Sequence, residues 1–326
     1  MTRLRRHWFL IGLCSVIVVG VQFAPQLRPI AEAAWLRQLL VVSVLFATSL
    51  PLRLEGIKRM VQAPGGTLLA CLVSWLLIPL LALPVVNVWG GDLGLGLMVA
   101  ATAPGTLASA AVWTRVAGGN ELIPIAVCVV TNLLACIVIP MWLDLLAISG
   151  ELGEVFHPVT AGRRLMVLVV VPMLAAQFAR LRGDVAQWAD QHHRRLSTFA
   201  QAAILVVVMI GAIQCGLLKS EEEAAFRLPS LLAVMGVTSI LHVLGLLCGI
   251  GLARGCGFDA ADRTGIAFAG SQKTLMVGLQ VAFLLGGGLI LLPMVVYHVM
   301  QLIIDAWLAS QWSLTAASSD GPSSES

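Results

Sequence analysis

Residues 265–278 of the chain read GIAFAGSQKTLMVG, inside an apolar segment that runs from about Thr264 to Leu285. A segment of this length can cross the hydrocarbon core of a bilayer as a helix. Its middle holds a serine, an amide, an ammonium and a hydroxyl in succession. A lysine at that depth costs at least a few kcal/mol unless it is paired or faces water, so the cluster predicts a functional site. The alternative is two short elements with Lys273 on the loop between them.

The composition places the whole chain in a membrane. Of its 326 residues, 59% are hydrophobic and 11% are charged, and the mean hydropathy is +0.93. Soluble domains are about one quarter charged, so we predict a single all-α polytopic membrane domain over residues 1–320, with no soluble domain. The net charge of +3 is no nucleic-acid signature, and the seven scattered cysteines support neither a metal site nor a disulfide framework.

Ten apolar segments follow one another along the chain, each near the length of a spanning helix. Backbone groups in lipid must bond within their own segment, so all ten are predicted to be transmembrane helices. The segments are 7–24, 35–51, 66–86, 93–117, 121–143, 164–180, 199–218, 229–252, 263–285 and 288–310. Two polar connectors, Glu151–Gly162 and Gly183–Thr198, predict helices on the membrane surface. The Ser-rich residues 313–326 predict a disordered cytoplasmic tail.

The basic residues predict the orientation. Thirteen Lys and Arg residues fall in the loops of one side of this layout and six in those of the other. By the positive-inside rule the basic side is cytoplasmic, so both termini are predicted to be cytoplasmic and the protein to be integral to the cell (inner) membrane. The pair Arg163-Arg164 lies on the opposite side and departs from the rule. The first segment resembles a signal peptide, with a cleavage site near Ala31–Ala33, but we expect it to be retained because the repeat described next needs this helix.

An internal repeat relates the two halves of the chain. The sequence IPIAV at 123–127 matches LPMVV at 292–296. The overlay pairs Asn132 with Gln301 and, one span earlier, Thr102 with Gln272. The repeats cover about 7–145 and 160–310, with five spans each. An odd number of spans inverts the second repeat, and inverted repeats are typical of secondary transporters, whose site lies at the repeat interface near mid-membrane.

The fourth span carries a break of its own. Its residues 100–109 read AATAPGTLAS, with Pro104-Gly105 at mid-depth. Proline removes a backbone donor and clashes with the preceding turn, and glycine relaxes the backbone. Backbone groups freed at membrane depth are tolerated where they line a cavity or are buried in protein. We therefore expect the break to face its repeat partner, Lys273-Thr274; the alternative is an ordinary proline kink.

The last span adds polar residues beside Lys273. Tyr297, Gln301 and Asp305 recur at i, i+4 and i+8 and share one helix face. With a turn at Gly286–Gly288, Gln301 and Lys273 are expected at similar depth. Asp305 is the predicted carboxylate partner of Lys273, because no other acid falls inside a predicted span. The span histidines His242 and His298 are expected to have hydrogen-bonded packing roles.

Two stretches resemble the bile acid:sodium symporter superfamily, and more closely its SBF-like branch. They are Pro104–Val112, reading PGTLASAAV, and Phe268–Leu275, reading FAGSQKTL. The resemblance runs along essentially the whole chain as ten spans. It implies a core domain and a panel domain, and discontinuous fourth and ninth spans that cross near the substrate and ion sites.

The chain departs from the sodium-coupled members at the ion site. They carry a Ser-Asn pair in the fourth span, whereas here Ser109 precedes Ala110. They carry Glu-x-Gly-x-Gln-Asn in the ninth span, where this chain has Phe268 for the glutamate and Lys273 for the asparagine. The resemblance thus leads to the hypothesis that the Lys273 ammonium occupies the sodium region and that its protonation replaces sodium binding.

The sequence predicts a secondary active transporter of a small organic solute, an organic anion, by alternating access. Coupling to sodium or to protons stays open, as do the solute and the oligomeric state; no cofactor, metal or nucleic-acid partner and no enzyme activity is expected. The alternative is a membrane regulatory or scaffold protein that does not carry substrate. The candidate substrate- and ion-binding residues are Thr102, Pro104, Gly105, Thr106, Ser109, Asn132, Gly270, Ser271, Gln272, Lys273, Thr274, Tyr297, Gln301 and Asp305.

Overall fold

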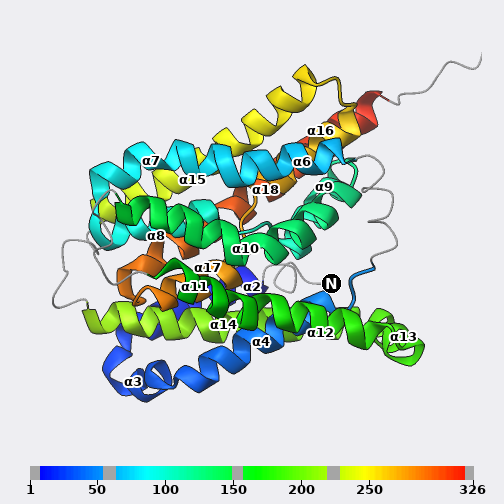
Figure 1. Cartoon of the computed structure of the whole chain (residues 1–326). Helices are drawn as coiled ribbons and strands as arrows, with labels where there is room; N and C mark the ends of the chain where they lie inside the picture. Colours follow the sequence, from blue (N-terminus) through cyan, green and yellow to red (C-terminus); the bar gives the residue numbers. More distant parts are fainter. Residues whose placement is uncertain (1–7, 54–63, 149–156, 219–227, 320–326) are drawn as a thin grey trace, which may run out of the picture.

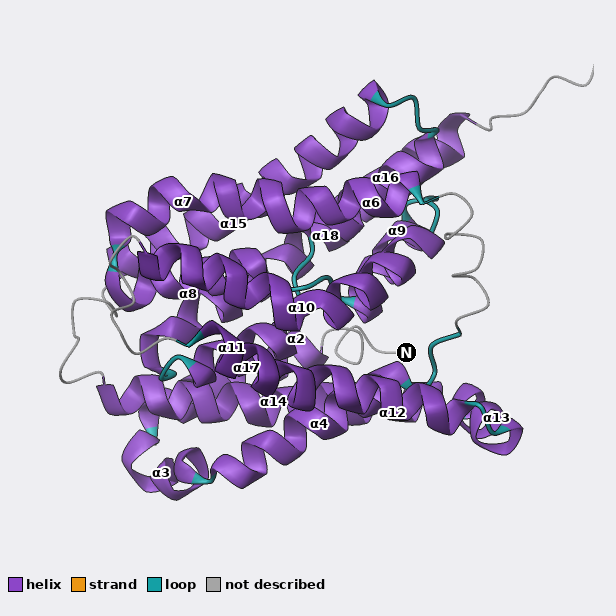
Figure 2. Ribbon diagram, in the orientation of Figure 1, coloured by secondary structure: helices purple, strands orange, loops and turns teal. Residues whose placement is uncertain are grey.

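The computed structural model describes residues 8–53, 64–148, 157–218 and 228–319, and the regular structure in these ranges is entirely helical (Figure 2). The first half contains α2 (Trp8–Gln22), α3 (Ala24–Glu32), α4 (Ala34–Ser49), α6 (Gly65–Leu72), the π-helical turn η1 (Val73–Leu77), α7 (Ile78–Trp89), α8 (Gly91–Thr102), α9 (Leu107–Val116) and α10 (Leu122–Ile148). The second half contains α11 (Pro158–Leu165), the π-helical turn η3 (Met166–Val170), α12 (Val171–Arg180), α13 (Gly183–Gln191), α14 (His193–Leu218), α15 (Leu228–Gly255), α16 (Ala260–Ser271), α17 (Leu275–Leu284), the 3-10 turn η5 (Gly288–Ile290) and α18 (Leu291–Ser319).

Six helices of the described residues are long and apolar enough to cross a membrane, or seven if one bent pair is a single span. The six are Gly65–Trp89, Leu122–Leu146, Pro158–Arg180, His193–Leu217, Leu228–Gly255 and Gly288–Ser313. The described residues therefore contain fewer helices of spanning length than the ten predicted spans, two of which were predicted to be discontinuous. The first predicted span is α2, which bends by 105° into α3, and the second is the 16-residue α4.

The other two differences are breaks inside predicted spans. The segment 93–117 forms α8 and α9, and the segment 263–285 forms α16 and α17; each pair consists of 12 residues and then 10 residues. Ala103 and Thr106 are extended at the edges of the first break, as are Gln272 and Thr274 at the second. The prediction that both spans are discontinuous is confirmed. Pro104 cannot donate a helical hydrogen bond, which explains the first break.

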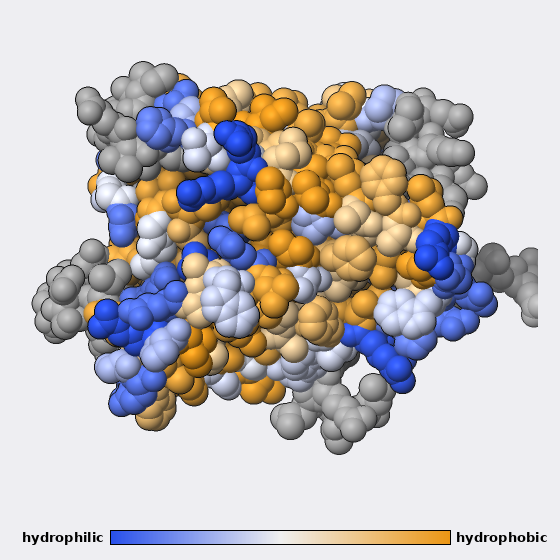
Figure 3. Space-filling model, turned by 60° about the horizontal axis from the view of Figure 1, so that its bottom comes forward, coloured by the Kyte–Doolittle hydropathy of each residue, from blue (hydrophilic) through white to orange (hydrophobic). Residues whose placement is uncertain are grey.

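The helices form two neighbouring groups (Figure 1). At the bottom of the view, α2, α3 and α4 pack against the long α14, and α12 packs against α4. Above them, α15 packs against α16 and α18, and α10 packs against α9, α11 and α16. The broken helices lie in this second group. Apolar side chains cover most of the face shown in Figure 3, with most of the strongly hydrophilic residues toward its two ends, as expected of a surface in contact with lipid.

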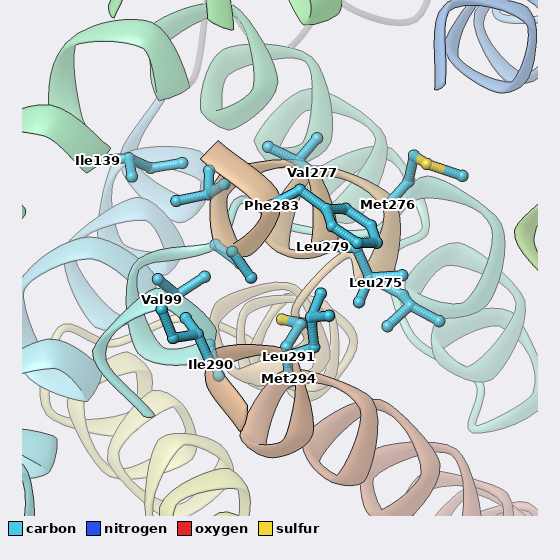
Figure 4. Packing of buried hydrophobic residues seen from close by; sticks show 14 of the residues in the cluster. Val99, Ile139, Leu275, Met276, Val277, Leu279, Phe283, Ile290, Leu291 and Met294 are labelled. Carbon is cyan, nitrogen blue, oxygen red and sulfur yellow. The ribbon is translucent and has the colours of Figure 1, made fainter. Parts of the chain in front are cut away.

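The interior between the groups is apolar and closely packed. The 10-residue α17 contributes Leu275, Met276, Val277 and Leu279 to the main hydrophobic cluster, together with residues of α8 and α18 (Figure 4). An added Cβ at Gly96 of α8 would come 2.5 Å from the carbonyl oxygen of Ile290. This close approach holds one half of the first broken helix against the start of α18.

Two polar segments outside the spans can be compared with the predictions. α13 is the helix predicted within Gly183–Thr198, although residues 193–198 belong to α14. The predicted tail differs, because α18 continues to Ser319 and residues 313–319 are therefore helical. Residues 320–326 lie outside the described residues, as do 151–156 of the other predicted surface helix.

Candidate functional site

The two broken helices meet at their breaks. The backbone N–H of Thr274 donates to the carbonyl oxygen of Pro104 at 2.8 Å. The hydroxyl of Ser109, in the first turn of α9, donates to Oε1 of Gln272 at 2.7 Å. One bond joins backbone to backbone and the other joins side chain to side chain. We call the place where the two breaks, residues 103–106 and 272–274, contact each other the crossing.

Neighbouring α10 satisfies the backbone of the first break. The N–H of Gly105 donates to Oγ1 of Thr131 at 3.0 Å, and the Gly105 carbonyl accepts from Nδ2 of Asn132 at 3.1 Å. Both side chains are buried. An unpaired backbone group at this depth would be costly, so Thr131 and Asn132 stabilise the open segment.

The last helix, α18, provides hydrogen-bond partners for the backbone of the second break. The N–H of Lys273 donates to Oε1 of Gln301 at 2.9 Å, and Nε2 of Gln301 donates to the Lys273 carbonyl at 2.8 Å. One turn away, the hydroxyl of Tyr297 donates to the Ser271 carbonyl at 2.9 Å. The prediction that Gln301 and Lys273 lie at similar depth is confirmed. Asn132 and Gln301, paired in the sequence overlay, thus each bind the backbone of the break in their own half of the chain.

The Lys273 side chain is fully buried and binds Ser74. Its Nζ donates to the Ser74 carbonyl at 2.6 Å and to the Ser74 hydroxyl at 2.8 Å. Ser74 lies in η1, and π-helical turns inside α-helices occur frequently at functional sites. The prediction that Asp305 pairs with Lys273 is therefore wrong. The lysine side chain is long enough for its ammonium to reach η1. The position of Lys273 along its own segment does not predict this partner.

Asp305 is instead paired with a histidine. Its Oδ1 lies 2.7 Å from Nε2 of His242 on α15, and its Oδ2 accepts from Nε2 of Gln272 at 2.5 Å. Asp305, His242 and Gln272 have no exposed surface. The face formed by Tyr297, Gln301 and Asp305 still points at the second break, as predicted, because all three bind residues 271–273 there.

The hydroxyls of Thr106, Ser109 and Thr274 differ from the rest of the crossing, because these three residues are half-buried. Thr106 and Thr274 precede the first residues of α9 and α17, and neither helix has a side-chain cap at this end. The N-termini of two helices, whose first N–H groups have no partner within their own helix, therefore lie at the crossing, an arrangement that favours negative charge.

The remaining predicted residues have structural contacts at the same place. The Thr102 hydroxyl donates to the Met98 carbonyl of its own helix at 2.8 Å. The Ser271 hydroxyl bonds likewise to Ala267. At Gly270 an added Cβ would come 3.0 Å from the side chain of Val73, so glycine lets α16 approach η1. All fourteen predicted residues thus lie at or beside the crossing.

The sequence analysis did not predict two residues at the crossing, Ser74 and Thr131, or the contact between His242 and Asp305. Ser74 and Thr131 are small hydroxyl residues inside apolar runs and carry no pattern. His242 had a signal, since a histidine inside a spanning segment is rare and calls for a named partner.

Two open hollows lie away from the crossing in the described part of the chain. One, of about 680 Å³, lies between α10 and α11 and includes Asp144 and Arg163. The other, of about 510 Å³, is lined by α4, η3, α12 and α14. Both are mostly apolar, and neither contains a residue of the crossing.

The helices and the crossing define an integral membrane protein with paired discontinuous helices, an arrangement found in secondary transporters. The model of the SBF-like CPA transporter family matches residues 7–314, and the chain belongs to this family. The resemblance seen in the sequence is thus confirmed. One relative is the "Probable sodium/metabolite cotransporter BASS4, chloroplastic" of Arabidopsis thaliana, 29% identical over 92% of this chain and 71% of the relative. Another is "Sodium/bile acid cotransporter 7" of Danio rerio, 28% identical over 94% of each chain.

Proposed function

We propose that this chain is a secondary active transporter that moves a small organic anion across the membrane by alternating access. The observation that carries this proposal is the crossing itself, where Thr274 binds Pro104 and two half-helices begin side by side. The solute would bind on the half-buried side of the crossing. There the hydroxyls of Thr106, Ser109 and Thr274 and the first N–H groups of α9 and α17 can receive an anionic group.

Alternating access is supported by the likeness of the two halves. Each half contains a helix broken into 12 and 10 residues, and a later helix whose amide side chain binds the break. In an inverted repeat of five spans, covering about 7–145 and 160–310, the two halves exchange conformations when the site opens to the other side. The ten-span layout, the division into core and panel domains, and cytoplasmic termini at the inner membrane belong to this proposal.

The coupling ion is either sodium or the proton. The names of both relatives contain sodium, which favours sodium. Lys273 favours the proton, because its side chain, when protonated, places a positive charge beside the break and opposes a second cation there. In this form of the proposal Lys273, held by Ser74, stands in the region that sodium would fill.

The test is uptake by the purified protein in proteoliposomes under an imposed sodium or proton gradient. The probes are a bile acid such as cholate, small carboxylates and a neutral sterol. We expect gradient-driven uptake of an anion, reduced in Ser109→Ala and Thr274→Val but not in Thr198→Val, which removes an exposed hydroxyl on α14. Uptake driven by sodium alone would contradict the role of Lys273 in place of sodium. No uptake of any probe would favour a regulatory or scaffold protein.

A further inference from the structure

We propose that His242 and Asp305 together form a binding site for one exchangeable proton, and that this proton is the coupling ion. The coupling role of this site rests on the proposed transport function. The proton-binding site itself is inferred from geometry alone. His242 comes from α15 and Asp305 from α18, and the side chains of both are fully buried.

Both ring nitrogens of His242 face an acceptor. Nε2 lies 2.7 Å from Oδ1 of Asp305, and Nδ1 lies 3.3 Å from the carbonyl oxygen of Ser271. A neutral imidazole has one N–H and can donate to only one of them. Both contacts are satisfied when the imidazole is doubly protonated, or when Asp305 carries the proton and donates to Nε2.

In either arrangement the pair holds one proton and has no net charge. Loss of that proton leaves a carboxylate with a full negative charge at a site without exposed surface, and it leaves Nδ1 or Nε2 without a hydrogen to donate. Burying an unpaired charge is costly, so the geometry favours the pair with its proton bound. The exchange is balanced: one proton enters the pair from the solution on one side and leaves to the solution on the other.

The pair is connected to the crossing through one amide. Oδ2 of Asp305 accepts from Nε2 of Gln272, and Oε1 of the same amide accepts from the Ser109 hydroxyl. Gln272 is also the first residue after α16, at the edge of the second break. A change in the charge of Asp305 therefore alters the bond that orients Gln272, and through it the contact between the two broken helices.

The other titratable groups around the pair are few. From α18, Tyr297 has its ring 5.8 Å from that of His242, and its hydroxyl donates to the Ser271 carbonyl. His298, buried on the same helix, has its Nδ1 2.8 Å from Nε2 of Gln301 and 3.4 Å from the Lys273 carbonyl oxygen. From the second break, Lys273 donates to Ser74 and not to Asp305. Among α6, η1 and α7, which also pack against α15, the sequence carries one such group, Cys71, close to Lys273. In α16, Asp262 and Arg263 lie near the opposite end of the helix.

Two opposing effects act on the charge of Asp305. The hydrogen bond from Gln272 stabilises a charged carboxylate, whereas burial opposes the charge. The two effects oppose each other, so a rearrangement of the crossing can shift the balance. Such a shift is what a coupling site requires.

The first test observes the proton directly, by nitrogen-15 NMR of histidine-labelled full-length protein from about pH 5 to pH 9. The chain has six histidines. The ring signals lost in His242→Gln identify this residue, and His192→Gln, which changes a half-buried ring stacked on Trp188, is the matched control. We expect His242 to titrate and its ring signals to shift in Asp305→Asn. A His242 that stays neutral at every pH, with no response to Asp305→Asn, would overturn the proton site.

The second test measures coupling with cholate as the probe in proteoliposomes. His242→Gln and Asp305→Asn should lose at least tenfold of the cholate accumulation driven by a proton gradient, whereas His192→Gln should accumulate cholate as the wild type does. Unchanged accumulation in both variants would overturn the coupling role. If the wild type moves no cholate while His242 titrates, the proposed function fails for this solute and the proton site stands. If His242→Gln does not fold, the histidine ring signals that shift in Asp305→Asn identify His242 in the wild type.

Discussion

The backbone N–H of Thr274 donates a hydrogen bond to the carbonyl oxygen of Pro104 across 2.8 Å, and this bond joins the middles of two interrupted helices. Pro104 leaves no helical donor at its own position, and its carbonyl finds a partner in the other half of the chain. The bond explains how two open backbone segments remain stable in the interior. The side-chain amides of Asn132 and Gln301, which bond to the backbone of the two breaks, should therefore stabilise the protein.

Replacement of Gln301 by alanine should destabilise the second break. The variant leaves the buried N–H of Lys273 without its partner, and the Lys273 carbonyl keeps a 3.4 Å contact with Nδ1 of His298 in place of the 2.8 Å bond from Gln301. Each unsatisfied buried group costs about 1–3 kcal/mol. We expect a clear fall in the melting temperature of the purified protein, and a similar but smaller fall for Asn132→Ala, which frees only the Gly105 carbonyl.

The control is Gln38→Ala, which removes an exposed amide on α4. This variant should melt at the wild-type temperature. If Gln301→Ala melted no lower than Gln38→Ala, the amide would not hold the break.

The bond between Lys273 and Ser74 can be measured by a double-mutant cycle. Ser74→Ala removes one of the two acceptors of the ammonium and should cost about 1–3 kcal/mol. Lys273→Met removes the charge and keeps an apolar chain of similar length, so the same serine change should cost little in that background. We expect an interaction energy of about 0.5–3 kcal/mol between the two sites, from chemical or thermal unfolding.

An interaction energy near zero would show that the serine hydroxyl does not stabilise the lysine. Asp305→Asn tested against Lys273→Met serves as the comparison. The structure predicts weaker coupling for that pair, because the carboxylate of Asp305 is bound by His242 and Gln272.

The sequence predicted the places of the breaks better than the partners inside them. Pro104-Gly105 and the polar run Ser271–Thr274 are local signals, and backbone interruption depends on local chemistry. The helix face with Gln301 followed from periodicity. The partner of Lys273 did not, because it depends on how η1 packs against α16, where Gly270 allows close approach. The predicted depth of Lys273 in the membrane limits its possible partners to residues at a similar depth. The packing of the helices then determines which of these residues it contacts.

The lengths of the helices likewise depend partly on local sequence, which could be predicted, and partly on packing, which could not. Hydropathy identified the apolar segment 7–24, but it does not report the 105° bend that divides it from α3. That bend depends on packing, since α2 and α3 both lie against α14. In the same way, the end of α18 at Ser319 was missed because serine-rich composition argues for disorder, while a helix already formed can extend through such residues.

Glycine at position 249 should be required for the contact between α15 and α16. A Cβ added there would come 2.9 Å from the Cα of Ala267, a backbone atom that cannot turn away. Gly249→Ala should therefore separate the helices and cost about 1–3 kcal/mol. Gly251→Ala is the matched control on the same helix, because an added Cβ there meets nothing within 4 Å. It should be neutral, or more stable by up to about 1 kcal/mol through helix propensity. Equal melting temperatures for the two variants would contradict the close approach.

Acid should weaken the attachment of α13 through Asp190. Desolvation by itself raises the pKa of this carboxyl, but hydrogen bonds and charge from Arg180 and Arg53 outweigh it and hold the pKa below its ordinary value. A carboxyl with a lowered folded-state pKa stabilises the protein fully above its unfolded pKa of about 3.9, and this stabilisation is lost as the pH falls through the folded value.

Asp190→Asn should consequently lower the melting temperature by a few degrees at neutral pH, since the half-buried guanidinium of Arg180 would keep only the Leu50 carbonyl and a neutral amide as partners. The difference from the wild type should shrink below about pH 4, where the carboxyl of the wild type takes up a proton. Melting curves from neutral pH down to about pH 3 measure this change. Glu32→Gln, which breaks an exposed pair with Arg28 on α3, should show almost no difference at neutral pH. A difference between Asp190→Asn and the wild type that stays constant down to pH values well below about 4 would show that the charge of Asp190 does not stabilise this contact.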